Sequence, residues 1–88
     1  MHVVFLGKFS RDLDDLTDND LKDAVKETIE AIEQASSLHD LPNVKKMKGF
    51  KDAFRIRIGD YRLGFYFRDG EIQIARFLHR SKIYRVFP

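Results

Sequence analysis

This 88-residue chain contains no cysteine and no long run of apolar residues. The absence of cysteine excludes a disulfide framework and a cysteine-ligated zinc site, and it suits a reducing compartment. The apolar stretch at residues 2–6 is too short for a signal peptide, and acidic residues soon follow it. No stretch approaches the roughly 20 apolar residues that cross a bilayer. We therefore expect a soluble, cytoplasmic protein with no membrane partner.

The length and composition are those of one small globular domain. A chain of 88 residues has room for a single hydrophobic core, and a hydrophobic fraction of 43% is ordinary for a soluble protein. No internal repeat, low-complexity tract or linker divides the sequence. We expect residues 1–88 to form one domain.

Charge is distributed unevenly along the chain. Residues 1–43 carry four basic and ten acidic side chains, a net charge of −6, whereas residues 44–88 carry twelve basic and four acidic ones, a net charge of +8. This asymmetry suggests a polyanion-binding surface in the second half. The alternative is that an acidic helical half and a basic sheet simply attract each other within the fold.

Local patterns predict an α+β domain of the order β-α-α-β-β-β. A strand is expected at residues 2–6, a short helix capped by Ser10, and a longer helix from Thr17 to about Ala35 or Ser36. Two-residue turns at 59–60 and 69–70 predict a meander of three strands. The sheet is then antiparallel, with about four strands and both N-terminal helices packed on one face. The three C-terminal strands are expected at residues 54–58, 61–68 and 71–79.

Two-residue turns also fix a register, which places Arg57 opposite Arg62 and Tyr61 opposite Leu78. Like charges directly opposite each other repel, so the pair needs an explanation. Arg76 falls on the core face opposite Leu63, where a bulge, an edge position or snorkelling would have to accommodate it. One face collects the apolar side chains that the helices cover. The other face collects Arg55, Arg57, Arg62, Tyr66, Arg68, Gln73, Phe77 and His79.

A basic face with aromatic rings among its charges is typical of nucleic-acid binding, although a solvated face is the simpler alternative. His79, Arg80 and Tyr84 follow the last strand, near Arg62. Cleavage of RNA requires a base for the 2′-OH, cations for the charged transition state and an acid for the leaving oxygen. These side chains can supply all three with no metal or other cofactor, and no acidic cluster has the spacing of metal ligands. A free phenol is a weak base at neutral pH, so Tyr84 would need neighbouring cations.

The segments "FRIRIGDYRLGFYF" and "FLHRSKIYRVFP" resemble the RelE/ParE superfamily of toxins from type II toxin–antitoxin pairs. The resemblance covers nearly the whole chain and implies a small antiparallel sheet with two N-terminal helices against it. It also implies a ribosome-dependent endoribonuclease that cuts mRNA in the A site. The 2′-OH would attack the phosphate and leave a 2′,3′-cyclic phosphate.

The resemblance implies roles for individual residues. Arg62 is similar to the arginine that stabilises the transition-state phosphate, and Arg80 resembles the one credited with phosphate stabilisation or leaving-group protonation. Tyr84 resembles the tyrosine that orients the nucleotide and serves as a candidate base, and His79 is a further catalytic candidate. Some relatives carry lysines where this chain has arginines, and arginine does not give up its proton, so the role of base would pass to Tyr84 or His79. The residues expected to bind RNA are Arg55, Arg57, Lys45, Lys46, Lys48, Lys51 and Phe77.

The resemblance also implies partners. They are a cognate antitoxin, the ribosome and mRNA, with operator DNA contacted only through the antitoxin complex. Two alternatives remain open from the sequence. The chain could be a ParE-like inhibitor of DNA gyrase without nuclease activity, or an inactive member that serves in an autorepressor complex.

Overall fold

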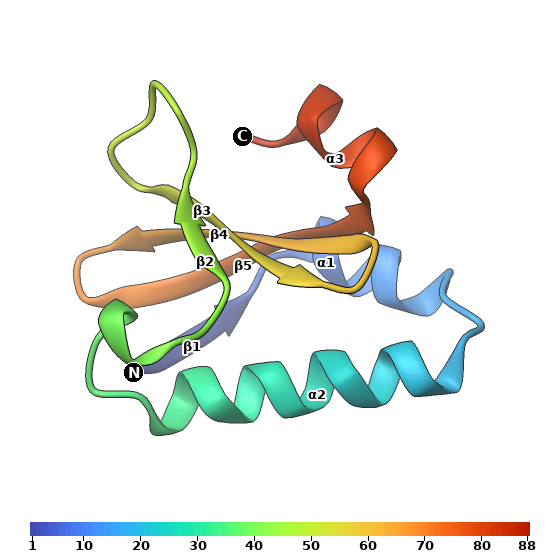
Figure 1. Cartoon of the computed structure of the whole chain (residues 1–88), viewed down its shortest axis with the longest axis horizontal. Coiled ribbons are helices and arrows are strands. Elements are labelled where there is room, and N and C mark those ends of the chain that lie inside the picture. Colours follow the sequence, from blue (N-terminus) through green and yellow to red (C-terminus); the bar gives the residue numbers. More distant parts are fainter.

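The computed structural model describes residues 1–88, and Figure 1 shows the path of the chain. The helices and strands are β1 (His2–Phe5), α1 (Gly7–Asp14), α2 (Asn19–Gln34), the short 3₁₀ helix η1 (Leu38–Asp40), β2 (Val44–Lys46), β3 (Ala53–Ile58), β4 (Tyr61–Arg68), β5 (Glu71–His79) and α3 (Arg80–Val86). None of the helices combines the length and the hydropathy that spanning a bilayer requires.

The strands form one mixed sheet of five strands in the order β1-β5-β4-β3-β2. β1 lies parallel to β5, and the other neighbours are antiparallel. In Figure 1, α2 runs along one face of the sheet and α3 stands on the other. The predicted α+β class and helix-covered sheet are confirmed. The prediction of a wholly antiparallel sheet is wrong at β1, which pairs parallel with β5, and strand β2 and helix α3 are additions to the predicted order.

The helix starts differ from the sequence expectation by a few residues. α2 begins at Asn19, because the side chain of Asp18, rather than that of Thr17, accepts a hydrogen bond from the backbone N–H of Leu21 at 3.1 Å. α1 begins at Gly7 and not after a Ser10 cap. The apolar stripe of α2 packs on the sheet as predicted. The core on this face comprises Phe9, Val25, Ile32, Ile56, Leu63, Phe65, Ile72, Ile74 and Phe77.

The predicted hairpin register is confirmed for β3 and β4, where Arg57 lies opposite Arg62 and Phe54 opposite Phe65. It is also confirmed at the start of the β4–β5 hairpin, where Phe65 lies opposite Ile74. The register then shifts between Gly64 and Phe65, because β5 holds one extra residue there. An extra residue turns every later side chain of that strand to the opposite face.

This bulge corrects the predicted places of Phe77, Leu78, Arg76 and His79; His79 lies opposite Tyr61 and not on the face of Arg62. Phe77 lies opposite Leu63 on the helix-covered face, 2% exposed and with its ring 5.2 Å from that of Tyr61, so its predicted place among the RNA-binding residues is wrong. Leu78 pairs with Arg62 instead of Tyr61 and packs on the face of α3.

Arg76 is another residue that the bulge relocates, from opposite Leu63 to opposite Gly64. Its Nε and Nη2 donate to the carboxylate of Asp12 on α1 at 2.8 and 3.1 Å, and this carboxylate also accepts from the backbone N–H of Phe77 at 3.0 Å. The carboxylate raises the pKa of Arg76 above its already high ordinary value. The bulge thus places the charge beside α1 and keeps it out of the core.

A second, smaller core lies under α3. Ile83 and Phe87 pack there on Ala53 and Ala75, and all four side chains are buried. Gly64 makes this contact possible, because a Cβ at that position would lie 2.7 Å from the ring of Phe87. The face that carries the arginines is therefore covered at one end by α3 and open at the other.

Candidate nucleic-acid interface

Four cationic side chains line one shallow hollow of about 230 Å³ on the face of the sheet that carries α3. Lys45 lies opposite Arg55 across β2 and β3, and Arg57 lies opposite Arg62 across β3 and β4. None of the four takes part in an ion pair of the structure. We call this site the basic hollow; its lining residues are Asn43, Val44, Lys45, Arg55, Arg57 and Arg62.

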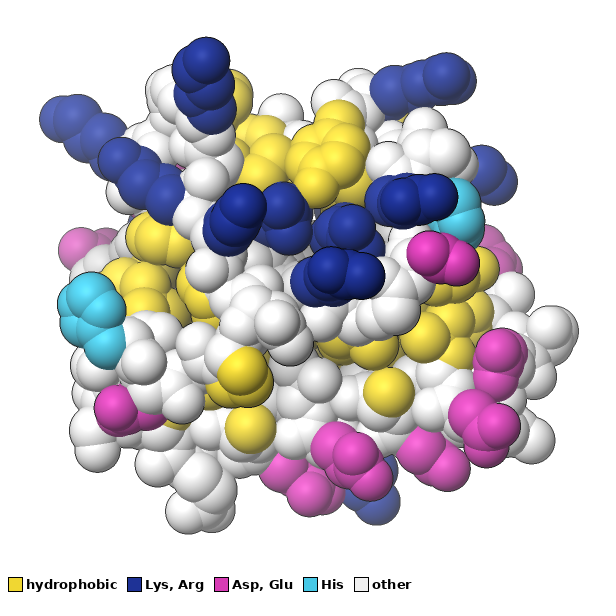
Figure 2. Space-filling view, in the orientation of Figure 1, with side chains coloured by type: hydrophobic (Ala, Val, Ile, Leu, Met, Phe, Trp, Pro, Cys, Tyr) yellow, Lys and Arg dark blue, Asp and Glu magenta, His cyan; other side chains and the backbone are white.

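Strand geometry explains why the charges gather there. Side chains alternate between the two faces of a strand, so burying Ile56 on the helix side turns Arg55 and Arg57 to the other. Figure 2 shows lysine and arginine side chains gathered across one part of the surface, whereas aspartate and glutamate side chains gather at the lower edge, where α2 runs. The sequence asymmetry is thus an asymmetry between two sides of the molecule.

Arg62 is held in place by the backbone of the β3–β4 turn. Its Nη1 donates to the carbonyl oxygen of Gly59 at 3.0 Å and to that of Tyr61 at 2.9 Å. Its Nε is buried without a hydrogen-bond partner. A buried N–H group without an acceptor costs free energy. An additional hydrogen-bond acceptor at this guanidinium would therefore stabilise it.

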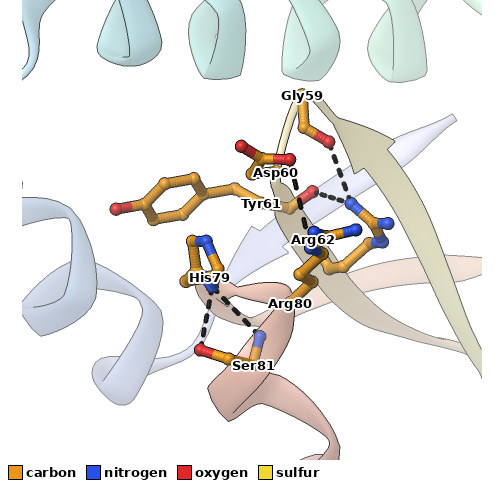
Figure 3. Close-up of polar contacts among 7 residues, drawn as sticks. All are labelled: Gly59, Asp60, Tyr61, Arg62, His79, Arg80 and Ser81. Carbon is orange, nitrogen blue, oxygen red and sulfur yellow. Dashed lines mark hydrogen bonds and ion pairs between the residues drawn. The ribbon is translucent and has the colours of Figure 1, made fainter.

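Arg80 contacts the same turn from the start of α3. Its backbone N–H donates to the carbonyl oxygen of Asp60 at 2.8 Å, and its Nε lies 4.0 Å from Oδ1 of that residue. Both side chains are mostly exposed, so this ion pair contributes little and leaves the guanidinium available. Figure 3 shows Arg62 and Arg80 on one side of the β5–α3 junction and His79 on the other.

His79 is the N-cap of α3. Its Nδ1 accepts a hydrogen bond from the backbone N–H of Ser81 at 3.1 Å and lies 2.8 Å from the hydroxyl oxygen of that residue. A nitrogen that accepts from an N–H carries no proton, so the neutral ring holds its proton on Nε2. The ring meets Tyr61 edge-on at 5.4 Å and lines a separate hollow beside Asp12 and Lys82. The structure does not bring His79 into the basic hollow.

Tyr84 lies on the exposed side of α3, with 51% of its surface accessible. Its neighbour Ile83 is buried and anchors the helix on the sheet. The phenol makes no hydrogen bond within the chain, so its hydroxyl is free to meet a ligand.

The predicted RNA-binding lysines separate into three environments. Lys45 lines the basic hollow, whereas Lys46 points to the other face and lines a pocket with Val44 and Phe54. Lys48 and Lys51 are exposed on the loop between β2 and β3. Of the four lysines, only Lys45 therefore lies in the basic hollow with the arginines.

Two residues of this region were missed from the sequence. Asn43 lines the hollow, and its carbonyl oxygen accepts from the backbone N–H of Arg57 at 3.2 Å. Its φ of 62° is left-handed, and the preceding Pro42 is the turn signal that could have indicated it. Ser81, the partner of the His79 cap, carried no signal. No group of three or more histidine, aspartate or glutamate side chains lies close enough to hold a metal.

Comparison with known proteins gives consistent matches. The family model described as the ParE toxin of type II toxin–antitoxin systems matches residues 3–84. Toxin RelE3 of Methanocaldococcus jannaschii is 37% identical over 89 residues, which covers all of both chains.

Solved structures match over nearly the full length as well. A chain of the RelB–RelE antitoxin–toxin complex from Methanococcus jannaschii superposes with a TM-score of 0.80 at 35% identity, over 97% of this chain and 99% of that one. A chain of the archaeal RelE–RelB complex from Pyrococcus horikoshii OT3 gives a TM-score of 0.71 at 22% identity, over 92% and 96% of the two chains, which shows a shared fold.

Proposed function

The chain belongs to the RelE/ParE superfamily of toxins from type II toxin–antitoxin systems, and we propose that it is a ribosome-dependent endoribonuclease that cleaves mRNA in the A site. One observation carries this proposal. Lys45, Arg55, Arg57 and Arg62 meet in one hollow with no acidic side chain to neutralise them. Such a cluster is stabilised by a polyanion, and the phosphates of mRNA supply one.

The proposed reaction is attack by the 2′-oxygen of one nucleotide on the adjacent phosphorus. The bond from phosphorus to the 5′-oxygen of the next nucleotide breaks, and a 2′,3′-cyclic phosphate remains. Negative charge builds up on the phosphate oxygens during this step, and fixed cations lower its energy. Arg62 is suited to this role because the turn holds its guanidinium in place, and Arg80 adds a second cation from the start of α3, which contacts the same turn.

Tyr84, as its phenolate, is the proposed base: it takes the proton of the 2′-OH, and the departing 5′-oxygen takes a proton from water. Arginine does not give up its proton in proteins, so a base must come from another side chain. The exposed phenol of Tyr84 makes no hydrogen bond that would occupy it.

His79 is then better described as a positioning residue. Its Nδ1 lone pair is engaged by the N-terminus of α3, the helix that carries Arg80 and Tyr84. With its proton on Nε2, the ring has no free lone pair with which to act as a base in this conformation.

A cognate antitoxin is the proposed partner that keeps the toxin inactive. The relatives from Methanococcus jannaschii and Pyrococcus horikoshii were solved as complexes of RelE with RelB. An antitoxin segment rich in acidic residues would complement the basic hollow and exclude RNA from it.

Induction of the chain in growing cells without antitoxin tests the proposal. Wild type, Arg62→Ala and Tyr84→Phe are compared, with Arg11→Gln as a matched control that removes an exposed arginine on α1, outside the hollow. We expect growth arrest with mRNA 5′ ends phased to codons in wild type and the control, and neither effect in the two site variants. Growth arrest with intact mRNA in wild type would contradict the proposal.

Gyrase inhibition is the alternative that the family match keeps open, because the matching model is described as a ParE toxin. A supercoiling assay on the same cells separates the two activities. Lost supercoiling with intact mRNA assigns the chain to gyrase inhibition. Unimpaired growth with abundant soluble protein assigns it to the inactive class.

A further inference from the structure

The loop between β2 and β3 exposes an aromatic ring that the catalytic proposal does not use. Phe50 is 47% exposed, whereas the nearby Met47 packs against the small core under α3. Figure 1 shows this loop rising from the same face of the sheet as α3.

The loop is anchored at both ends. The backbone N–H of Met47 donates to the carbonyl oxygen of Ala53 at 2.8 Å, and the N–H of Phe67 donates to that of Asp52 at 2.8 Å. The carboxylate of Asp52 is also paired with Arg68, which lowers the pKa of that carboxyl. Phe50 is therefore presented by a closed loop and does not belong to a loose segment.

The surroundings of the ring are cationic. Lys48 and Lys51 lie within two residues of Phe50, both are exposed, and neither has an ion-pair partner. The only acidic side chain of the loop, Asp52, is engaged by Arg68. An isolated exposed aromatic needs no explanation, but one between two free cations has the composition of a surface for single-stranded nucleic acid.

We propose that Phe50 stacks on an unpaired base of single-stranded RNA while Lys48 and Lys51 contact the flanking phosphates. The loop continues β2 and leads into β3, the two strands that bring Lys45 and Arg55 to the basic hollow. A strand of RNA bound in the hollow can therefore extend onto the loop. The inference rests on the proposed function, since it takes RNA as the ligand, but it concerns binding and not cleavage.

The absence of tryptophan from the chain allows a direct test. Phe50→Trp introduces a single tryptophan, excited selectively at long wavelength, whose emission is quenched when a base stacks on it. Phe5→Trp is the matched control, because Phe5 is 52% exposed at the end of β1, on the opposite edge of the sheet from β2. The probe is a single-stranded RNA of about ten nucleotides, the size range that such surfaces bind, with 2′-O-methyl sugars that prevent cleavage.

We expect quenching in Phe50→Trp and none in Phe5→Trp. In the wild-type background, Phe50→Ala and Phe50→Leu should bind the probe roughly 5- to 150-fold more weakly, with the same salt dependence as wild type. Lys48→Gln should instead reduce the slope of log affinity against log salt by about 0.7.

Three outcomes would overturn the inference, and they differ in what they imply. If the probe binds but the emission of Phe50→Trp is not quenched, or Phe50→Leu binds as tightly as wild type, Phe50 has no stacking role and the proposed function stands. If neither wild type nor any variant binds the free RNA, the inference fails, whereas the proposed function is decided separately by the codon-phased mRNA cuts in cells. If the emission of Phe50→Trp responds to antitoxin and not to RNA, the ring belongs to the protein interface.

Discussion

Arg57 and Arg62 lie directly opposite each other on β3 and β4, and both line the basic hollow with no acidic side chain between them. Like charges in this position destabilise a sheet by up to about 1 kcal/mol. Binding of a phosphate reverses this, because the anion is attracted to both groups. We therefore expect the cross-strand repulsion to be relieved when a phosphate binds.

Replacing Arg57 with glutamine should separate activity from stability. We expect the free energy of unfolding to stay the same or rise by up to about 1 kcal/mol, while RNA cleavage falls at least tenfold. Urea unfolding and a cleavage assay measure the two effects. A stability loss of more than about 1 kcal/mol would show that the pair is structural.

Arg62→Gln serves as the companion to that variant. It also removes the hydrogen bonds to Gly59 and Tyr61, each worth about 0.5–1.5 kcal/mol, so it should be less stable than Arg57→Gln. In the double variant Arg57→Gln/Arg62→Gln, the change in the free energy of unfolding should differ from the sum of the two single changes. The reason is that either single change already relieves the repulsion.

The cap at His79 predicts a pattern of rescue. His79→Ala should lower the free energy of unfolding by about 1 kcal/mol and reduce activity, since α3 loses its N-cap. Asparagine is among the best caps, so His79→Asn should restore both, although it has no imidazole. Full activity loss in His79→Asn with normal stability would show instead that the ring takes part in the chemistry.

The close packing of Phe87 on Gly64 should affect both the stability of the protein and the position of α3, which carries Arg80 and Tyr84. Gly64→Ala should shift Phe87 and loosen α3, with a stability loss of about 1–3 kcal/mol and reduced activity. Gly7→Ala is the control, since a Cβ there meets nothing within 4 Å. Thermal unfolding of the two variants provides the comparison, and equal stability of Gly64→Ala and wild type would contradict the close packing.

The hydrogen bonds between Asp12 and Arg76 should stabilise the bulge in β5. Asp12→Ala removes the acceptor of three hydrogen bonds at a site where both side chains are largely buried, so we expect a loss of about 2–4 kcal/mol. Asp14→Ala, an exposed position on the same helix, should cost less than about 0.5 kcal/mol. Similar losses in the two variants would argue against this role of Asp12.

The sequence predicts the features that depend on neighbouring residues in the chain, and it does not predict those that depend on contacts between distant segments. The turns at Gly59-Asp60 and Asp69-Gly70 require backbone conformations that glycine and aspartate tolerate, so the hairpins and the Arg57–Arg62 pair were predictable. The bulge follows from long-range packing with α1, and its only sequence signal was the misplaced Arg76.

The same limit applies to the edges of the sheet and to the site. β2 has three residues and is specified by its pairing with β3, not by any pattern of its own. The parallel pairing of β1 depends on where two distant segments meet. For the same reason the sequence could propose His79 as a site residue but could not show that its ring caps α3.

The most direct test of the central claim is cleavage of mRNA on programmed ribosomes by the purified protein, with a 2′-deoxy sugar at the nucleotide whose 2′-oxygen would attack. The account predicts cleavage of the normal mRNA to a 2′,3′-cyclic phosphate, no cleavage of the deoxy mRNA, and loss of the reaction in Arg62→Gln. Equal cleavage of the two mRNAs, or full activity of Arg62→Gln, would contradict it.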